Sequence, residues 1–364
     1  MEKNKILNNS LIILFSIFPL AILLGNFAIN SLVFITGSIF IFKLLKRDTQ
    51  ILAYKNTLYL LIFFFISLVI NLIFSNNFYL SYQRVIKFFF MIFFIIAFKF
   101  LIINYFKKLK FIYKVWSIFF LIVIFDLIFE FFVGKNILGQ TSIMAGRLGS
   151  FTGEESVIGH YFFGFSLIFL TYLYNQTTKI SLNLIFAIFF IIVSFLIGER
   201  ANFIKTFIAI TIFIFFAYKV NYKYKFFSIF VVLILSNLTF WSLNDDYKAR
   251  YFDQITPIFS PNGLDNFLSE SKYGAHRNVA KEIFLDNPFF GAGIKNFRVE
   301  SGKKKYEDLD HKKNRYRISN HPHELYYEFL SETGIFGLIC FLIFIFTSLF
   351  ISLKNYFKNR NMYQ

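Results

Sequence analysis

Two histidines near the carboxyl end of the chain are the residues best suited to acid–base chemistry. His321 and His323 lie in the segment HPHELYYEFLSETGIFG (residues 321–337), where a long polar stretch ends and a last apolar segment begins. An imidazole exchanges a proton near neutral pH, so either ring is a candidate general base. Two of the five histidines of the chain occur here, ahead of Gly334 and Gly337. We therefore expect the reaction centre in this segment.

Acidic residues follow these histidines at helical spacing. Glu324, Glu328 and Glu332 are four residues apart, so that a helix would place them on one face. Such a stripe either orients a protonated imidazole or forms a solvated face. Pro322 and Glu324 also suit the first turn of a helix, where proline and acidic side chains are favoured. Glu324 is therefore a secondary candidate for the site, as is His321.

Three arginines are candidates for binding an anion. Arg147 and Arg200 lie at the ends of apolar segments in a chain that otherwise prefers lysine, and Arg277 lies in a polar region ahead of Gly291 and Gly293. A guanidinium group keeps its charge and presents a planar fork that fits phosphate oxygens. The alternatives are arginines that extend along the membrane surface to reach water, and for Arg277 a charge on a helix surface.

The elements that carry these residues are membrane helices. The chain has 364 residues, of which 57% are hydrophobic, and its mean hydropathy is +0.58. Several apolar runs reach about 18 residues, the length that crosses a bilayer. We predict an all-α fold, a polytopic helical membrane protein with about 10–12 transmembrane helices and one large loop. The single cysteine, Cys340, lies in an apolar segment and rules out a disulfide framework.

Ten spans can be placed in the sequence, and they divide the chain into three parts. The predicted spans cover about residues 6–24, 27–44, 57–74, 85–103, 111–133, 157–174, 180–197, 203–218, 226–243 and a last segment that ends near 352. Residues 1–243 form the N-terminal transmembrane helices with short loops. Residues 244–323 form the large loop, which we expect to be partly helical, and residues 324–364 form the final helix with a cytoplasmic tail.

The distribution of charge sets the predicted orientation. The formal net charge is +17, and most basic residues are lysines in short connections, which the positive-inside rule places in the cytoplasm. This explanation of the charge excludes nucleic acid as a partner. With the N-terminus inside, the loops that carry Arg147, Arg200, Arg277 and His323 all face the outside.

Sequence signatures of other enzyme classes are missing. The segment GAGIKNF (residues 291–297) lacks the strand that precedes a phosphate-binding glycine loop. Asp308, Asp310 and His311 are close in sequence, but a solvated loop explains them better than a metal site. No serine hydrolase motif occurs. We therefore expect neither a metal nor a cofactor.

The pattern around the histidines resembles the signature of the O-antigen ligase and O-antigen polymerase superfamily of bacterial membrane glycosyltransferases. His323 is followed by Glu324, by nine further residues, and then by Gly334 and Gly337 before the final span. The superfamily usually has Asn, Ser or Gln where this chain has Glu324. This spacing favours His323 over His321 as the general base.

Three other segments resemble the same superfamily and follow in the same order. RLGSF (residues 147–151) resembles its Arg-x-Gly-x-Phe motif, and ERA (residues 199–201) resembles its Ser-Arg-Gly segment, with Glu and Ala as departures. Residues 276–297 resemble the loop in which an arginine precedes a helix and a Gly-x-Gly turn.

The resemblance implies an enzyme that uses a glycan carried on undecaprenyl pyrophosphate, at the periplasmic face of the bacterial inner membrane. It implies an inverting, metal-independent transfer, with His323 as catalytic base and Arg147, Arg200 and Arg277 as pyrophosphate ligands. The favoured acceptor is the lipid A–core of lipopolysaccharide, which would make the chain an O-antigen ligase.

Other functions remain open from the sequence. An O-antigen polymerase would use another lipid-linked glycan as acceptor, and a third relative would transfer the glycan to protein. A transporter of glycans or lipids belongs to another class, and Asp126 and Glu130 within a span fit it equally well.

Overall fold

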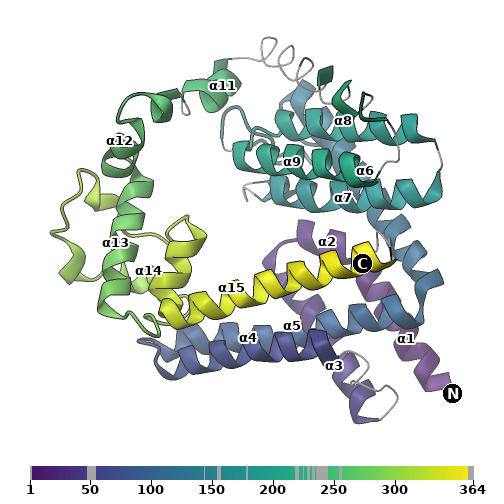
Figure 1. The fold of residues 1–364 in the computed structure, drawn as a ribbon, viewed down its shortest axis with the longest axis horizontal. Coiled ribbons are helices and arrows are strands. Elements are labelled where there is room, and N and C mark those ends of the chain that lie inside the picture. Colours follow the sequence, from purple (N-terminus) through teal and green to yellow (C-terminus); the bar gives the residue numbers. More distant parts are fainter. Residues whose placement is uncertain are drawn as a thin grey trace. The chain divides into compact units, whose positions relative to one another are not determined.

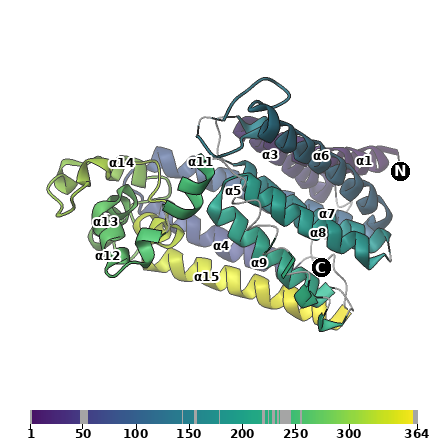
Figure 2. The same ribbon diagram turned by 90° about the horizontal axis from the view of Figure 1, so that it is seen from above.

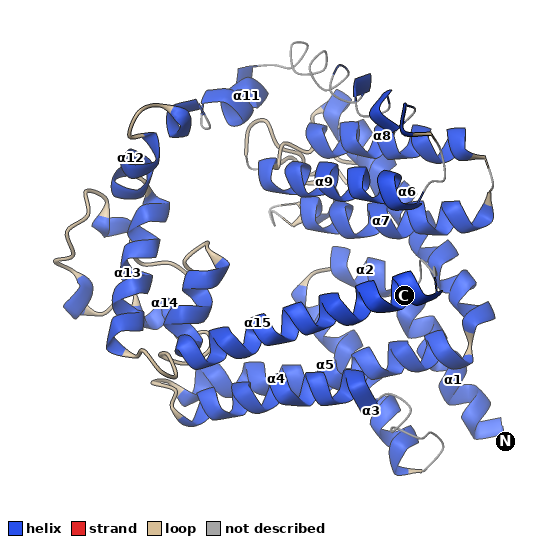
Figure 3. Cartoon of the chain, viewed as in Figure 1, coloured by secondary structure: helices blue, strands red, loops and turns tan. Residues whose placement is uncertain are grey.

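The computed structural model describes residues 2–46, 55–142, 144–153, 157–177, 179–217, 245–253 and 256–359, and a few residues between 221 and 234. Within these ranges the chain is helical and has no β-strand (Figure 3). Six described helices are long and apolar enough to cross a membrane: α3 (Asn26–Leu45), α4 (Lys55–Ile73), α5 (Phe78–Asn104), α6 (Phe106–Val133), α9 (Arg200–Ala217) and most of α15 (Leu325–Asn359). The prediction of a polytopic helical membrane protein is thus confirmed.

The described residues form eight further α-helices. They are α1 (Glu2–Ser16), α2 (Phe18–Leu23), α7 (Ile158–Gln176), α8 (Ile180–Leu196), α11 (Asp245–Lys248), α12 (Gly263–Glu270), α13 (Lys272–Asp286) and α14 (Phe297–Glu300). The first predicted span is interrupted at Ile17, because Pro19 has no N–H to continue the helix. The predicted span over residues 226–243 lies largely outside the described residues.

The described helices fall into two compact units. The first unit comprises Met1–Leu32 and Phe100–Thr256. Its helices α7, α8 and α9 pack against one another, and α6 packs against α7 and α8 (Figure 2). Large aromatic side chains fill this bundle, since the ring of Phe120 lies 5.2 Å from that of Phe162 and 5.2 Å from that of Phe190. The bundle provides a rigid base for the polar loops at its ends.

The second unit comprises Val33–Lys99 and Pro257–Met362. In it, α4 lies alongside α15, and α13 packs against the start of α15 (Figure 1). Helix α13 and the polar segment that follows it have an apolar core of their own, built from buried side chains that include Val279, Ile283 and Phe297. This region is therefore a packed part of the protein and can hold side chains in fixed positions.

Helix α15 is interrupted at Gly334, and a loop enters the break. Gly334 has φ 66° and ψ −171°, which a residue with a Cβ rarely adopts. Backbone hydrogen bonds join residues 288–293 to α15 on both sides of the break. A Cβ on Gly334 would lie 2.3 Å from the carbonyl oxygen of Phe289, and one on Gly291 would lie 2.4 Å from the backbone of Glu332. The two glycines allow the loop and the helix to meet backbone to backbone.

Candidate functional site

Two buried carboxylates of α6 hold the loop between α6 and α7 in the first unit. Glu130 accepts hydrogen bonds from the backbone N–H groups of Gly149, at 3.0 Å, and Ser150, at 2.7 Å. Asp126 accepts from the Ser150 hydroxyl at 2.5 Å and from the Ile137 N–H at 2.7 Å. These carboxylates, on which the transport alternative depends, are thus engaged by the protein's own loop.

The loop held in this way carries Arg147, which forms an ion pair with Glu199. The guanidinium and carboxylate groups are 2.5 Å apart, and both side chains are largely buried. The chain segments that carry them are joined by a backbone hydrogen bond of 3.0 Å. Gly198 makes this approach possible, because a Cβ there would lie 2.1 Å from the carbonyl oxygen of Gly146. Glu199, a departure from the superfamily motif, is therefore the counter-ion of Arg147.

Arg200 and Arg250 complete a cluster of three arginines in the first unit. Arg200 directly follows Glu199 at the start of α9, and the Arg250 Nε donates to the Gly198 carbonyl at 3.1 Å. Burial lowers the pKa of Arg250, and the positive charges of Arg147 and Arg200 lower it further. We call these three arginines the arginine cluster. Arg250 did not emerge from the sequence, although it too is an arginine in a lysine-rich chain.

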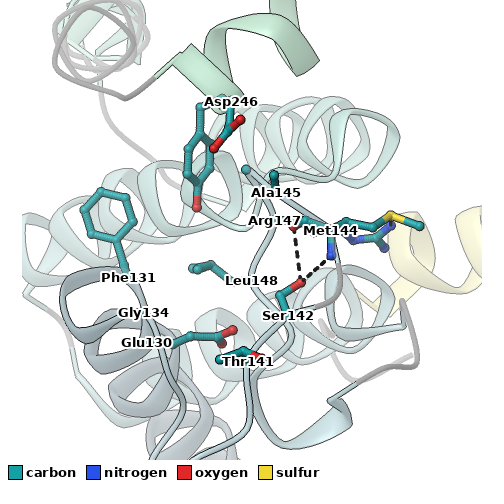
Figure 4. Close-up of a pocket in the computed structure, with 12 residues that line it drawn as sticks. Glu130, Phe131, Gly134, Thr141, Ser142, Met144, Ala145, Arg147, Leu148 and Asp246 are labelled. Atoms are coloured by element: carbon teal, nitrogen blue, oxygen red, sulfur yellow. Dashed lines mark hydrogen bonds between the residues drawn. The ribbon is translucent and has the colours of Figure 1, made fainter.

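A pocket of about 500 Å³ opens beside Arg147 in the first unit (Figure 4). Ser142, Asp246 and Tyr247 line it together with Arg147. The Tyr247 hydroxyl donates to the Leu196 carbonyl at 2.9 Å, which fixes that wall. A fixed guanidinium at the edge of a pocket with neutral and acidic walls can bind one anionic group of a larger, polar ligand.

Three histidines come together in the second unit. His323 lies just before α15, and its ring centre is 4.1 Å from that of His321 and 5.2 Å from that of His276. The rings of His276 and His323 are nearly parallel, with an angle of 26°, and Tyr273 meets His323 edge-on at 5.6 Å. His323 also has φ 59°, an uncommon backbone conformation that aims its side chain into this group. We call His276, His321 and His323 the histidine cluster.

The surroundings of His323 keep its ring neutral. Neighbouring atoms displace water from the ring and lower its pKa to about 4, and the charges of His321, His276 and Lys272 act in the same direction. A neutral imidazole is the form that accepts a proton. In the described part of the chain, no group of three or more His, Cys, Asp or Glu side chains has the geometry to hold a metal ion.

His276 is the member of this cluster that sequence reasoning missed. Its side chain is buried, its Nδ1 has no hydrogen-bond partner, and burial lowers its pKa. It lies on α13, far from His323 in sequence, and only the packing of α13 on α15 brings the two rings together. No local spacing could have revealed this pair.

Arg277 belongs to the second unit and not to the arginine cluster. It follows His276 on α13, and its guanidinium lies 4.9 Å from the ring centre of Tyr327 on α15. Such a contact stabilises a cation against an aromatic face. The structure thus brings Arg277 into the region of His321 and His323.

The predicted acidic stripe divides into an exposed end and a buried end. Glu324 is exposed, and its carbonyl accepts the first backbone hydrogen bond of α15, from Glu328 at 2.9 Å. Glu332 is buried, and its carboxylate accepts from the Phe297 N–H at 3.3 Å. Glu332 therefore holds the loop of the second unit, and the interpretation of the stripe as a solvated face is wrong for this residue.

Comparison with known proteins gives one family match, over the C-terminal part of the chain. Residues 184–342 match the family model described as O-antigen ligase. This matched region includes Arg200, Arg250, Arg277 and His323. The predicted resemblance to the O-antigen ligase and O-antigen polymerase superfamily is therefore confirmed over these residues, and the apolar helices make the chain a multi-pass membrane protein. No curated protein and no solved structure gives a significant match to the chain.

Proposed function

We propose that this chain, which resembles the O-antigen ligases over residues 184–342, is a membrane glycosyltransferase of the bacterial inner membrane. It transfers a glycan from undecaprenyl pyrophosphate to the lipid A–core of lipopolysaccharide, at the periplasmic face. The observation that carries the proposal is the position of His323, a neutral histidine held among other rings at the start of the last membrane helix.

His323 acts as the general base. The acceptor hydroxyl attacks the anomeric carbon from the face opposite the pyrophosphate, so the configuration inverts. The new bond joins the acceptor oxygen to this carbon, while the bond from the carbon to the pyrophosphate oxygen breaks. The hydroxyl proton passes to the neutral ring of His323 and then to water. A positioned base of this kind contributes about 10²- to 10⁴-fold to a rate.

The arginines stabilise the departing pyrophosphate. Arg147, Arg200 and Arg277 are its proposed ligands, and Arg250 adds a further guanidinium group to the first two. Fixed positive charges can neutralise the charge that develops on a leaving group without a metal ion. Glu199 keeps Arg147 oriented through their ion pair while the other arginines of the cluster keep the net charge positive.

An O-antigen polymerase is the second candidate function. Its chemistry is the same, and its acceptor is another lipid-linked repeat unit. The test is transfer by the purified protein from a defined undecaprenyl-pyrophosphate glycan to each acceptor separately. Product on lipid A–core supports the ligase, and product on a lipid-linked repeat alone supports the polymerase.

Deletion of the gene gives an independent test. A ligase-deficient cell accumulates free lipid-linked polymer, whereas a polymerase-deficient cell attaches a single repeat. Movement of an intact donor across vesicles, without cleavage of the sugar–pyrophosphate bond, would contradict both enzymes and support a transporter.

A further inference from the structure

Helix α13 presents two different polar faces within the second unit. On one face, Tyr273 and His276 contact the ring of His323. The other face has positions separated by three, four and seven residues, the spacing of one side of a helix. These positions line a pocket of about 510 Å³, and they are Gly274, Arg277, Asn278 and Lys281.

The walls of this pocket are held by contacts within the protein. A Cβ on Gly274 would lie 1.8 Å from the Leu268 carbonyl oxygen, so α13 touches the facing wall through its backbone. His311 Nε2 lies 2.9 Å from the same oxygen, and its Nδ1 accepts from the Lys313 N–H at 3.0 Å. Both ring nitrogens are thus used within the wall, and Nε2 carries the hydrogen.

The lining of the pocket favours negative charge. Arg277, Lys281 and Lys312 contribute cations, and Asp310 contributes one carboxylate. Lys312 forms an ion pair with Glu270 at 2.5 Å, so its charge is offset. The two other cations of the pocket, Arg277 and Lys281, lie on α13. The other lining residues include the polar Ser269 and Asn278, the aromatic Tyr327 and the apolar Leu268.

We infer that this pocket, which we call the α13 pocket, binds a saccharide that carries carboxylate or phosphate groups. Cations bind its acidic groups, amide and hydroxyl groups bind its hydroxyls, and the tyrosine ring offers an apolar edge. Tyr327 contacts Arg277, and Arg277 directly follows His276 on α13, so a saccharide in the pocket lies close to the histidine cluster. Its meaning as a substrate subsite rests on the proposed function.

Binding is measured first, without any reaction. The full chain in phosphatidylcholine nanodiscs is titrated by calorimetry with tetragalacturonate, an acidic tetrasaccharide, and with the neutral maltotetraose. We expect tetragalacturonate to bind and maltotetraose to bind at least about 10-fold more weakly, because charged hydrogen bonds are the stronger ones. Equal binding of the two tetrasaccharides, or binding of neither, overturns the inference.

Variants of exposed lysines locate the binding. Lys281→Gln is expected to weaken tetragalacturonate binding about 5- to 10-fold, and Lys281→Arg to preserve it. Lys304→Gln removes the same charge from an exposed position outside the pocket and is expected to have no effect. An equal effect of the two glutamine variants overturns the inference. If soluble short-chain phosphatidylglycerol displaces bound tetragalacturonate as effectively as free saccharide does, the inference is also overturned, and the pocket binds a lipid headgroup.

Transfer kinetics then identify the source of the saccharide. With acidic substrates, a higher KM of Lys281→Gln for the donor alone assigns the α13 pocket to the donor, and a higher KM for the acceptor alone assigns it to the acceptor. Unchanged values for both overturn its role as a subsite. If the chain binds the saccharide through Lys281 but transfers no glycan, the proposed function is wrong and the inference about the pocket holds. If the chain transfers a glycan but shows no such binding, the proposed function holds and the inference about the pocket is wrong.

Discussion

The arginine cluster of the first unit holds permanent charges, and one of its members, Arg147, lies on a loop anchored by Asp126 and Glu130 from within a helix bundle. The histidine cluster of the second unit holds groups whose charge depends on pH, and packed rings position them. Within the arginine cluster, like charges are offset by the carboxylate of Glu199. Within the histidine cluster, the exclusion of water from the ring lowers the pKa of His323, and like charges lower it further.

This difference matches two chemical tasks. A leaving group that is always negative requires a partner that is always positive, and that partner needs only to be held in place. A proton acceptor must be uncharged before the reaction, so its neighbours must oppose its protonation. The two clusters thus hold the two kinds of group that the proposed glycosyl transfer from a pyrophosphate requires.

Removal of the base should have the largest effect. His323→Ala is expected to lower kcat for transfer about 10²- to 10⁴-fold, because the positioned proton acceptor is lost. Donor binding should change little, since the arginine cluster is untouched. Glu324→Gln, at the exposed neighbour, serves as the control and should retain most activity. Near-wild-type transfer by His323→Ala inserted in the membrane would remove the assignment of the base.

Replacement of a guanidinium by an ammonium group should have the next largest effect. Arg200→Lys keeps the charge but loses the planar fork, and kcat/KM is expected to fall about 10- to 100-fold. Arg250→Lys should act in the same direction. Lys248→Gln removes a charge from the same region and should cost less. A greater loss in Lys248→Gln than in Arg200→Lys would show that charge alone matters.

The pH dependence of transfer separates the two clusters. Because the pKa of His323 is lowered to about 4, the base is neutral above that pH and becomes protonated as the pH falls through it. The rate should therefore stay level from pH 8 to about pH 5 and fall below that, whereas an ordinary histidine would lose activity below about pH 6.5. Rates measured from pH 4 to pH 8 distinguish the two profiles.

Neighbouring histidines should shift the pH at which the rate falls on the acidic side, which we call the acidic limb. His321→Gln removes the strongest of the nearby charges and should raise the pKa of His323, so that activity at pH 5 falls by a few-fold while activity at pH 8 is kept. His276→Phe keeps a stacked ring and should give a smaller shift in the same direction. Arg147→Lys should leave the limb in place, and an equal shift in that variant would contradict the separation of roles.

Chelation should have the smallest effect. If guanidinium groups alone neutralise the pyrophosphate, EDTA leaves the transfer rate of the purified protein unchanged. Inhibition by EDTA that an added divalent ion reverses would overturn the metal-free mechanism and would shift the task of the arginine cluster to orientation of the donor.

The membrane helices and part of both clusters could be predicted from the sequence. Apolar runs place helices because a bilayer imposes a length on them, and α4, α8 and α9 begin and end close to the predicted spans. His323, Arg147 and Arg200 could be selected because they are scarce residue types at the ends of such runs. A local pattern sufficed for each of these residues.

Tertiary packing determines what the sequence could not reveal. Arg250 lies in a short helical segment, residues 249–253, that no sequence motif marked, and its Nε donates to the Gly198 carbonyl. His276 on α13 meets the ring of His323, which lies just before α15. In the sequence, Glu199 is only a departure from a motif, and the folded chain alone shows its ion pair with Arg147. Asp126 and Glu130 fit a transporter in the sequence, because the sequence does not show the loop that donates hydrogen bonds to them.

The glycine-lined junction between residues 288–293 and α15 has a consequence for biogenesis. Four main-chain hydrogen bonds tie this loop to the helix on both sides of Gly334. The ribosome makes the loop before it makes α15, so during translation the loop has no partner for these groups. Only insertion of the last helix closes the junction and sets His323 beside His276. A chain that ends before Gly334 should therefore reach the membrane with its earlier helices in place and its histidine cluster unassembled. The proposed activity should then require that α15 be translated and inserted.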